Sequence, residues 1–79
     1  MRKIKQGTED EWRAFGRAVK DLRDQFLTVG MEYQGLLPVK QMDYYFDIVR
    51  KIDKFRTKAE CEMFRRGGPQ DIKVWYPGD

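Results

Sequence analysis

Hydrophobic positions in the first half of the chain recur at alternating spacings of three and four residues. Residues three and four apart lie on the same side of an α-helix, so this spacing predicts an amphipathic helix. At roughly 100° per residue the positions fall within one narrow arc, which indicates a single lengthwise neighbour. This stripe consists of Trp12, Phe15, Val19, Leu22, Phe26 and Val29.

The ends of the first helix are marked by local signals. Thr8 and Glu11 have the spacing of a capping box, in which each side chain satisfies a backbone N–H at the helix start. Gly30 follows the last stripe residue, where glycine commonly ends a helix. We therefore expect the first helix over about residues 9–29.

The second helix is expected over about residues 38–66. Pro38 suits its first turn, and Gly67, Gly68 and Pro69 end it. A second capping box at 57–60 leaves a break near residue 57 as the alternative, although the continuous spacing of Ile52, Phe55, Ala59 and Met63 favours one helix.

The apolar residues of the second helix cover roughly half of its circumference, about twice the width of the first stripe. One narrow neighbour cannot cover such a face, so a second copy, the C-terminal tail or a target protein must contact it. The set is Val39, Met42, Tyr44, Tyr45, Phe46, Ile48, Val49, Ile52, Phe55, Ala59, Met63 and Phe64.

The ends of the chain are predicted to lie outside the helices. Residues 70–79 alternate between apolar and polar, which is typical of a short extended or β segment, and residues 1–7 form a flexible N-terminal arm. We expect one small domain over 1–79, mainly α, built as an antiparallel helical hairpin with this tail laid across the second helix. The alternative is an α+β fold in which the tail pairs with Arg2–Lys5 in a small two-stranded ribbon.

At 79 residues the chain has a small core, and we expect it to be completed by dimerisation into a four-helix bundle. Because the stripe is expected to be buried, either Val19→Asp or Leu22→Asp should unfold the protein.

Composition argues against catalysis and metal binding. The chain has no histidine and one cysteine, Cys61, which excludes a disulfide within the chain and disfavours a zinc site. Asp43 and Asp47 share a helix face but are expected to be exposed, without the burial that raises a carboxyl pKa. We expect no enzyme activity, no cofactor and no metal.

No segment approaches the ~20 apolar residues that span a membrane, and no signal peptide is apparent. We therefore expect a cytoplasmic protein without a membrane partner. The net charge of +3 does not by itself require a nucleic-acid partner.

Basic residues nevertheless gather on the side of the second helix opposite its apolar face. This basic ridge is either a solvated surface or a contact for phosphate groups or an acidic protein, and contacts to nucleic acid would be independent of sequence. It consists of Arg50, Lys51, Lys54, Lys58 and Arg65.

Aromatic residues make up 14% of the chain, more than a two-helix core requires. Tyr44, Trp75 and Tyr76 are candidates for contacting a protein partner, because exposed Trp and Tyr often carry binding energy. The alternative for Trp75 and Tyr76 is that they anchor the tail to the second helix.

The sequence thus favours a non-enzymatic protein-interaction module, an adaptor or inhibitor that occupies a surface on a larger cytoplasmic protein. The alternatives are a nucleic-acid-associated protein that uses the basic ridge and a structural self-assembly unit.

Overall fold

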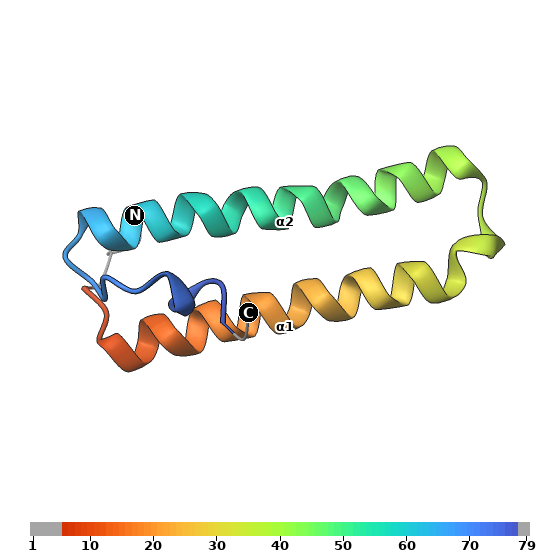
Figure 1. Cartoon of the computed structure of the whole chain (residues 1–79). Helices are drawn as coiled ribbons and strands as arrows, with labels where there is room; N and C mark the ends of the chain where they lie inside the picture. The colour runs from red at the N-terminus through yellow and green to blue at the C-terminus, as the bar shows by residue number, and fades with distance from the viewer. Residues whose placement is uncertain (1–5, 78–79) are drawn as a thin grey trace, which may run out of the picture.

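The computed structural model describes residues 6–77, which form an antiparallel helical hairpin (Figure 1). Helix α1 spans Glu9–Tyr33 and helix α2 spans Val39–Arg65. The 3₁₀ turn η1, Gln34–Leu36, connects them, and the 3₁₀ turn η2, Ile72–Val74, lies in the tail. The predicted fold class is confirmed. No strand occurs in residues 6–77, and Arg2–Lys5, the proposed ribbon partner, lies outside the described residues.

The start of α1 is as predicted. The Thr8 hydroxyl accepts a hydrogen bond from the backbone N–H of Glu11 at 3.1 Å, and the Glu11 carboxylate accepts from the backbone N–H of Thr8 at 2.9 Å. Acidic residues in the first turn also face the positive end of the helix dipole. The capping box thus fixes where α1 begins.

The predicted end of α1 at Gly30 is wrong, because the helix continues to Tyr33. Gly30 is buried where the two helices approach closely. A Cβ atom at this position would lie 2.3 Å from the ring of Tyr45. Glycine is required here for close packing and not for a helix end.

Helix α2 is continuous through residue 57, and the second capping box starts no new helix. The Thr57 hydroxyl instead donates to the carbonyl of Asp53, four residues earlier, at 3.3 Å. Pro38 caps the helix, and Gly67 follows it with a φ of 77°. A left-handed conformation of this kind strongly favours glycine.

The buried residues of α2 repeat every seven positions: Met42, Val49, Arg56 and Met63. Residues seven apart return to nearly the same side of a helix, so these four form one contact line. The buried positions of α1 are Gly16 and Gly30, which are two such repeats apart. Gly30 faces Tyr45 and Phe46 of α2, whereas Gly16 faces Val74 of the tail.

The predicted stripe of α1 is only partly buried. Trp12, Val19 and Phe26 are partly covered, whereas Phe15, Leu22 and Val29 are 48%, 60% and 42% exposed. The prediction that all six stripe residues are buried is wrong for Phe15, Leu22 and Val29. Gly16 and Gly30 allow close approach on the neighbouring side of the helix, which turns half of the stripe away from the contact.

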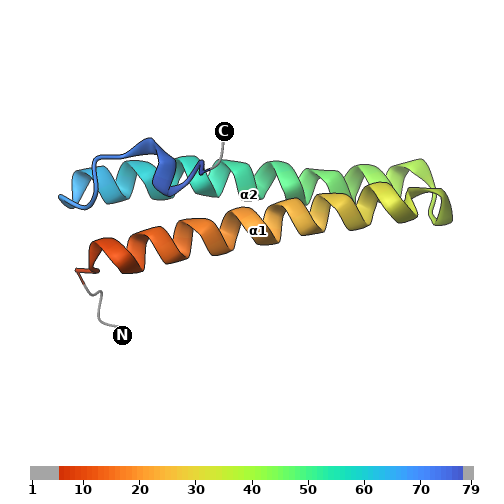
Figure 2. The same ribbon diagram turned by 60° about the horizontal axis from the view of Figure 1, so that its bottom comes forward.

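The tail, residues 67–77, covers one face of the hairpin (Figure 2). Val74 and Trp75 are 2% and 0% exposed and form the core with Met63. A Cβ atom on Gly16 would lie 2.0 Å from the carbonyl oxygen of Val74, so the tail backbone rests directly on α1. The tail is not a strand: η2 places Val74 inward and leaves Ile72 exposed.

Trp75 reaches between the two helices. Its ring lies edge-on to Phe15 and Phe55, with centroid distances of 5.1 and 6.0 Å. The buried guanidinium of Arg56 donates to the Trp75 carbonyl from Nη2 and Nε at 2.5 and 3.2 Å, and to Asp53 from Nη1 at 3.1 Å. Arg56 therefore joins α2 to the tail backbone.

Candidate functional site

Residues 31–39, which comprise the end of α1, the connection with η1 and the first residue of α2, are called the tip. Its apolar side chains are all more than half exposed, and Leu36 reaches 78%. Exposed apolar groups that cluster in this way mark interaction surfaces in soluble proteins. The group consists of Met31, Tyr33, Leu36, Leu37 and Val39.

A shallow hollow of about 290 Å³ lies beside the tip. Its lining includes Leu36 and Leu37 from the tip, and Met42 and Tyr45 from α2. Tyr45 is fixed there, because its hydroxyl donates to the carbonyl of Phe26 at 2.6 Å and its ring stacks on that of Phe26 at 4.0 Å. The tip thus combines exposed apolar groups with a rigid, apolar floor.

The three aromatic candidates occupy different environments. Tyr44 lies near the tip and is 72% exposed, so it is accessible to a partner. Trp75 is wholly buried, and the structure places it in the core, as the alternative of a tail anchor requires. Tyr76 is partly buried: its hydroxyl lies 2.8 Å from that of Thr57, and the Arg56 guanidinium lies 4.4 Å from its ring centre. The structure brings Trp75 and Tyr76 together but leaves Tyr44 apart.

The basic ridge lies on the exposed side of α2. Arg50 pairs with Asp47, and Arg65 pairs with Glu62, so acidic neighbours offset both ends of the ridge. Lys51, Lys54 and Lys58 form no ion pair with any described residue. These three lysines are the part of the ridge that has unpaired charge.

The face of the hairpin opposite the tail is called the open face. Phe15, Leu22 and Val29 lie on it from α1, and Phe55 joins them from α2, with its ring centre 6.2 Å from that of Phe15. By helical spacing Ile48 and Ile52 share the side of Phe55. A hollow of about 450 Å³ lined by Leu22, Val29 and their neighbours lies on this face.

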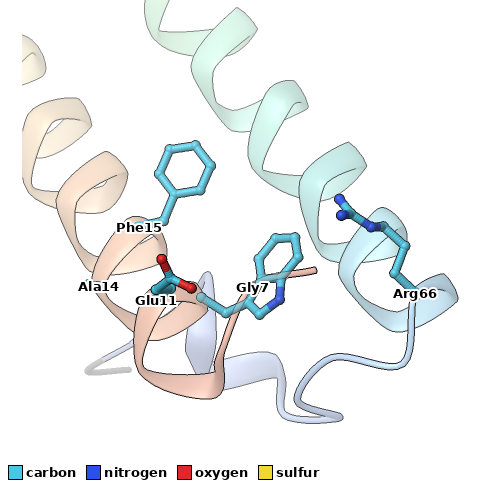
Figure 3. Close-up of a pocket in the computed structure, with 6 residues that line it drawn as sticks. Gly7, Glu11, Ala14, Phe15 and Arg66 are labelled. Atoms are coloured by element: carbon cyan, nitrogen blue, oxygen red, sulfur yellow. The ribbon is translucent and has the colours of Figure 1, made fainter. Parts of the chain in front are cut away.

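A further pocket of about 390 Å³ lies at the end of the hairpin away from the tip (Figure 3). Phe15 and Arg66 face it from α1 and from the end of α2. The Arg66 guanidinium lies 5.7 Å from the ring centre of Trp12, within the range of a cation–π contact. The arrangement stabilises the junction of the helix ends.

Ion pairs gather on the tail side of the molecule. Arg13 pairs with Asp71 of the tail at 3.3 Å, and Arg23 of α1 pairs with Asp53 of α2 at 3.0 Å. The backbone N–H of Lys73, followed by Arg13, lowers the pKa of Asp71. The hydrogen bonds that Arg23 donates to the Asp53 carboxylate raise the pKa of Arg23. These pairs tie α1 to the tail and to α2.

Every resolved pKa shift in the described residues favours the charged form: arginine pKa values are raised and carboxyl pKa values are lowered. Acid–base catalysis instead requires groups whose pKa moves toward neutral pH. Asp43, Asp47 and Cys61 are all exposed. No group of acidic or cysteine side chains suited to holding a metal ion occurs in residues 6–77.

Among the described residues neither helix has a stretch apolar enough to cross a lipid bilayer. Comparison with protein-family models, curated proteins and solved structures finds no match to this chain. The site is therefore interpreted from its own geometry.

Sequence reasoning did not identify Arg56, which holds the tail, or the tip as a cluster. The signal for Arg56 was present, because it stands seven residues from both Val49 and Met63 and so shares their side of α2. No periodic signal marks the tip, since its residues belong to the end of one helix, a turn and the start of the next.

Proposed function

We propose that this protein is a non-enzymatic protein-interaction module that binds a larger protein through its tip, as an adaptor or inhibitor. The observation that carries the proposal is the exposure of Met31, Tyr33, Leu36, Leu37 and Val39 within one short segment. Burying apolar surface yields about 25 cal/mol per Å², so these side chains offer substantial binding energy.

The tip has the composition of an interface centre. Tyr33 supplies the tip with an aromatic group that has a polar end, and Tyr44 supplies another beyond the tip on α2. Such groups are enriched where proteins bind one another. The hollow beside Leu37 offers a place for an apolar side chain of the partner. We infer that the partner presents an apolar surface, such as one face of an amphipathic helix.

The remaining features support a binding role. Among residues 6–77 the charged groups with shifted pKa values serve ion pairs of the fold, as Arg23 and Asp71 do. Cys61 is an exposed free thiol, which suits a reducing compartment, and we propose that the partner is cytoplasmic.

Capture of the partner tests the proposal. Leu36→Asp places a charge at the most exposed apolar position of the tip, where the side chain contributes little to the core. The matched control is Thr28→Asp, which adds the same charge at an exposed position of α1 outside the tip. Wild type and control should capture the same larger protein from lysate of the source cells, and Leu36→Asp should lose it. Capture of nothing by the wild type, or equal capture by Leu36→Asp, would contradict the proposal.

Contact with nucleic acid is a second candidate, favoured by the unpaired Lys51, Lys54 and Lys58. Binding through them would be independent of sequence and strongly weakened by salt. A titration of duplex DNA at low salt, repeated with Lys54→Glu and Lys58→Glu, decides this candidate: the absence of binding by the wild type rejects it.

A further inference from the structure

The open face is a long apolar surface on a molecule that has only one layer of helices. A stable domain normally buries its apolar surface between two packed layers. The tail supplies a partial second layer on one side, but Leu22 and Val29 on the other side remain largely exposed. The open face adjoins the tip, because Val29 and Tyr45 line the hollows at both places. Leu22 lines only the hollow of the open face and Leu36 only that of the tip, so these two residues distinguish the occupant of the open face from the partner proposed above.

The chain exposes more surface than a compact molecule of its mass. The chain exposes 6373 Å² of surface, whereas a compact monomer of this mass is expected to expose roughly 5000 Å². The excess is larger than the roughly 800 Å² that each partner contributes to a standard protein interface. Burying the open face against a second surface would reduce this excess.

The charges beside the open face differ between the two helices. On α1 the exposed charged residues on the outer side next to this face are acidic: Glu11, Asp21 and Glu32. On α2 the corresponding side carries Lys40, Lys51 and Lys58. Asp47 and Glu62 also lie there, but Arg50 pairs with Asp47 and Arg65 pairs with Glu62. The open face therefore has an acidic edge and a basic edge.

We propose that a second copy of this chain covers the open face, related by a two-fold axis parallel to the helices. Such a rotation places α1 of each copy against α2 of the other, so each acidic edge meets a basic edge. A two-fold axis across the helices would instead pair α1 with α1 and bring like charges together. The charge pattern selects the first arrangement.

The level of each residue along the hairpin follows from the Arg23–Asp53 pair, which joins the two helices at one height. Rotation about a parallel axis preserves this height. Asp21 of one copy therefore lies level with the segment between Lys51 and Lys58 of the second copy. Phe15, Leu22 and Val29 pack against Ile48, Ile52 and Phe55 across the interface, which completes a four-helix bundle.

The arrangement also places both tips at the same end of the dimer. The interface leaves Leu36 and its neighbours uncovered, so two tips stand side by side and both tails lie on the outer faces. A larger protein would then meet a doubled tip surface.

Leu22→Glu tests the interface by mass measurement in sedimentation equilibrium. The wild type should have twice the 9.5 kDa mass of the chain, and Leu22→Glu should be monomeric with unchanged helical circular dichroism. Thr28→Glu, the same charge on the outer side of α1, should remain dimeric. A wild type that is monomeric at all accessible concentrations, or a dimer that Leu22→Glu leaves intact, would overturn the proposal.

Charge exchange tests the orientation. Asp21→Lys should raise the dimer dissociation constant several-fold at low salt, since it then faces lysines of the second copy. Adding Lys51→Glu and Lys58→Glu to the same chain should restore the wild-type value. If the two-fold axis instead ran across the helices, α1 would face α1, and Asp21→Lys would only replace one like-charged pair with another. An unchanged dissociation constant would therefore overturn the proposed axis parallel to the helices.

The tip variant Leu36→Asp should leave the dimer intact, because Leu36 lines the hollow beside the tip and not the hollow of the open face. Loss of partner capture without loss of the dimer, or the reverse, therefore separates failure of the proposed function from failure of this inference.

Discussion

At the scale of single residues, two glycines and one arginine determine how the hairpin packs. Gly16 lies under the Val74 carbonyl and Gly30 lies under the ring of Tyr45. Arg56, only 6% exposed, donates both to the tail backbone and to Asp53. Removing one partner from a buried charged hydrogen bond is costly, so we regard Arg56 as essential for tail docking.

Gly16→Ala tests the close approach of the tail. Alanine favours a helix over glycine by up to about 1 kcal/mol, but its Cβ would meet the Val74 carbonyl at 2.0 Å. Because this atom belongs to the backbone, we expect a net loss of roughly 1–3 kcal/mol in the free energy of unfolding, measured by urea denaturation.

Gly35→Ala is the matched control, since nothing lies within 4 Å of a Cβ atom there and its φ is not positive. We expect it to be neutral or to stabilise the protein by up to about 1 kcal/mol. Equal effects of the two substitutions would show that the tail does not rest on Gly16.

At the scale of elements, the sequence predicted the two helices well and their contact surfaces poorly. The capping box at Thr8 and the stop at Gly67 are local signals, so they could be identified without the fold. Which half of the α1 stripe is buried depends on where Gly16 and Gly30 allow another segment to approach, and that is a tertiary property. Val19 packs against the core whereas Leu22 does not, so only Val19→Asp is now expected to unfold the chain.

In the candidate site, too, local features could be predicted from the sequence and tertiary contacts could not. The basic ridge could be predicted because it follows helical spacing, although its pairing with Asp47 and Glu62 could not be assigned to particular atoms. Trp75 could equally have been exposed or buried, because an aromatic residue in a tail has no periodic neighbours. Its ring is buried against Phe15 and Phe55, which come together only when the two helices pack and the tail docks.

Docking of the tail should weaken in acid. The pKa of Asp71 is lowered in the fold by the Lys73 N–H and by Arg13, and that of Asp24 is lowered by Lys20 and Arg23. A lowered folded-state pKa means that the stabilisation is complete above the unfolded value, about 3.9, and is lost as the pH falls through the lower folded value. Thermal stability should therefore be nearly constant from about pH 5 to 7 and fall below about pH 4.

Asp71→Asn isolates the contribution of the tail, since Asp24 titrates in both proteins. We expect a lower melting temperature for this variant at neutral pH and a smaller further decrease in acid. Parallel melting-temperature profiles for wild type and variant between about pH 2 and 7 would contradict the role given to Asp71.

At the scale of the whole molecule, the tail makes the hairpin asymmetric. One face is closed by Val74 and Trp75, and the other carries exposed Phe15, Leu22 and Val29. The closed face accounts for the small core, and the open face and the tip account for the apolar groups that the core does not use. The proposed dimer and the proposed partner each use one of these two remaining surfaces.

The fluorescence of Trp75 tests this asymmetry most directly. Trp12→Phe leaves Trp75 as the only tryptophan of the chain. The folded variant should emit at short wavelength and be protected from quenching by acrylamide, and urea should remove both properties. Emission typical of a water-exposed indole, with ready quenching in the folded protein, would contradict the account.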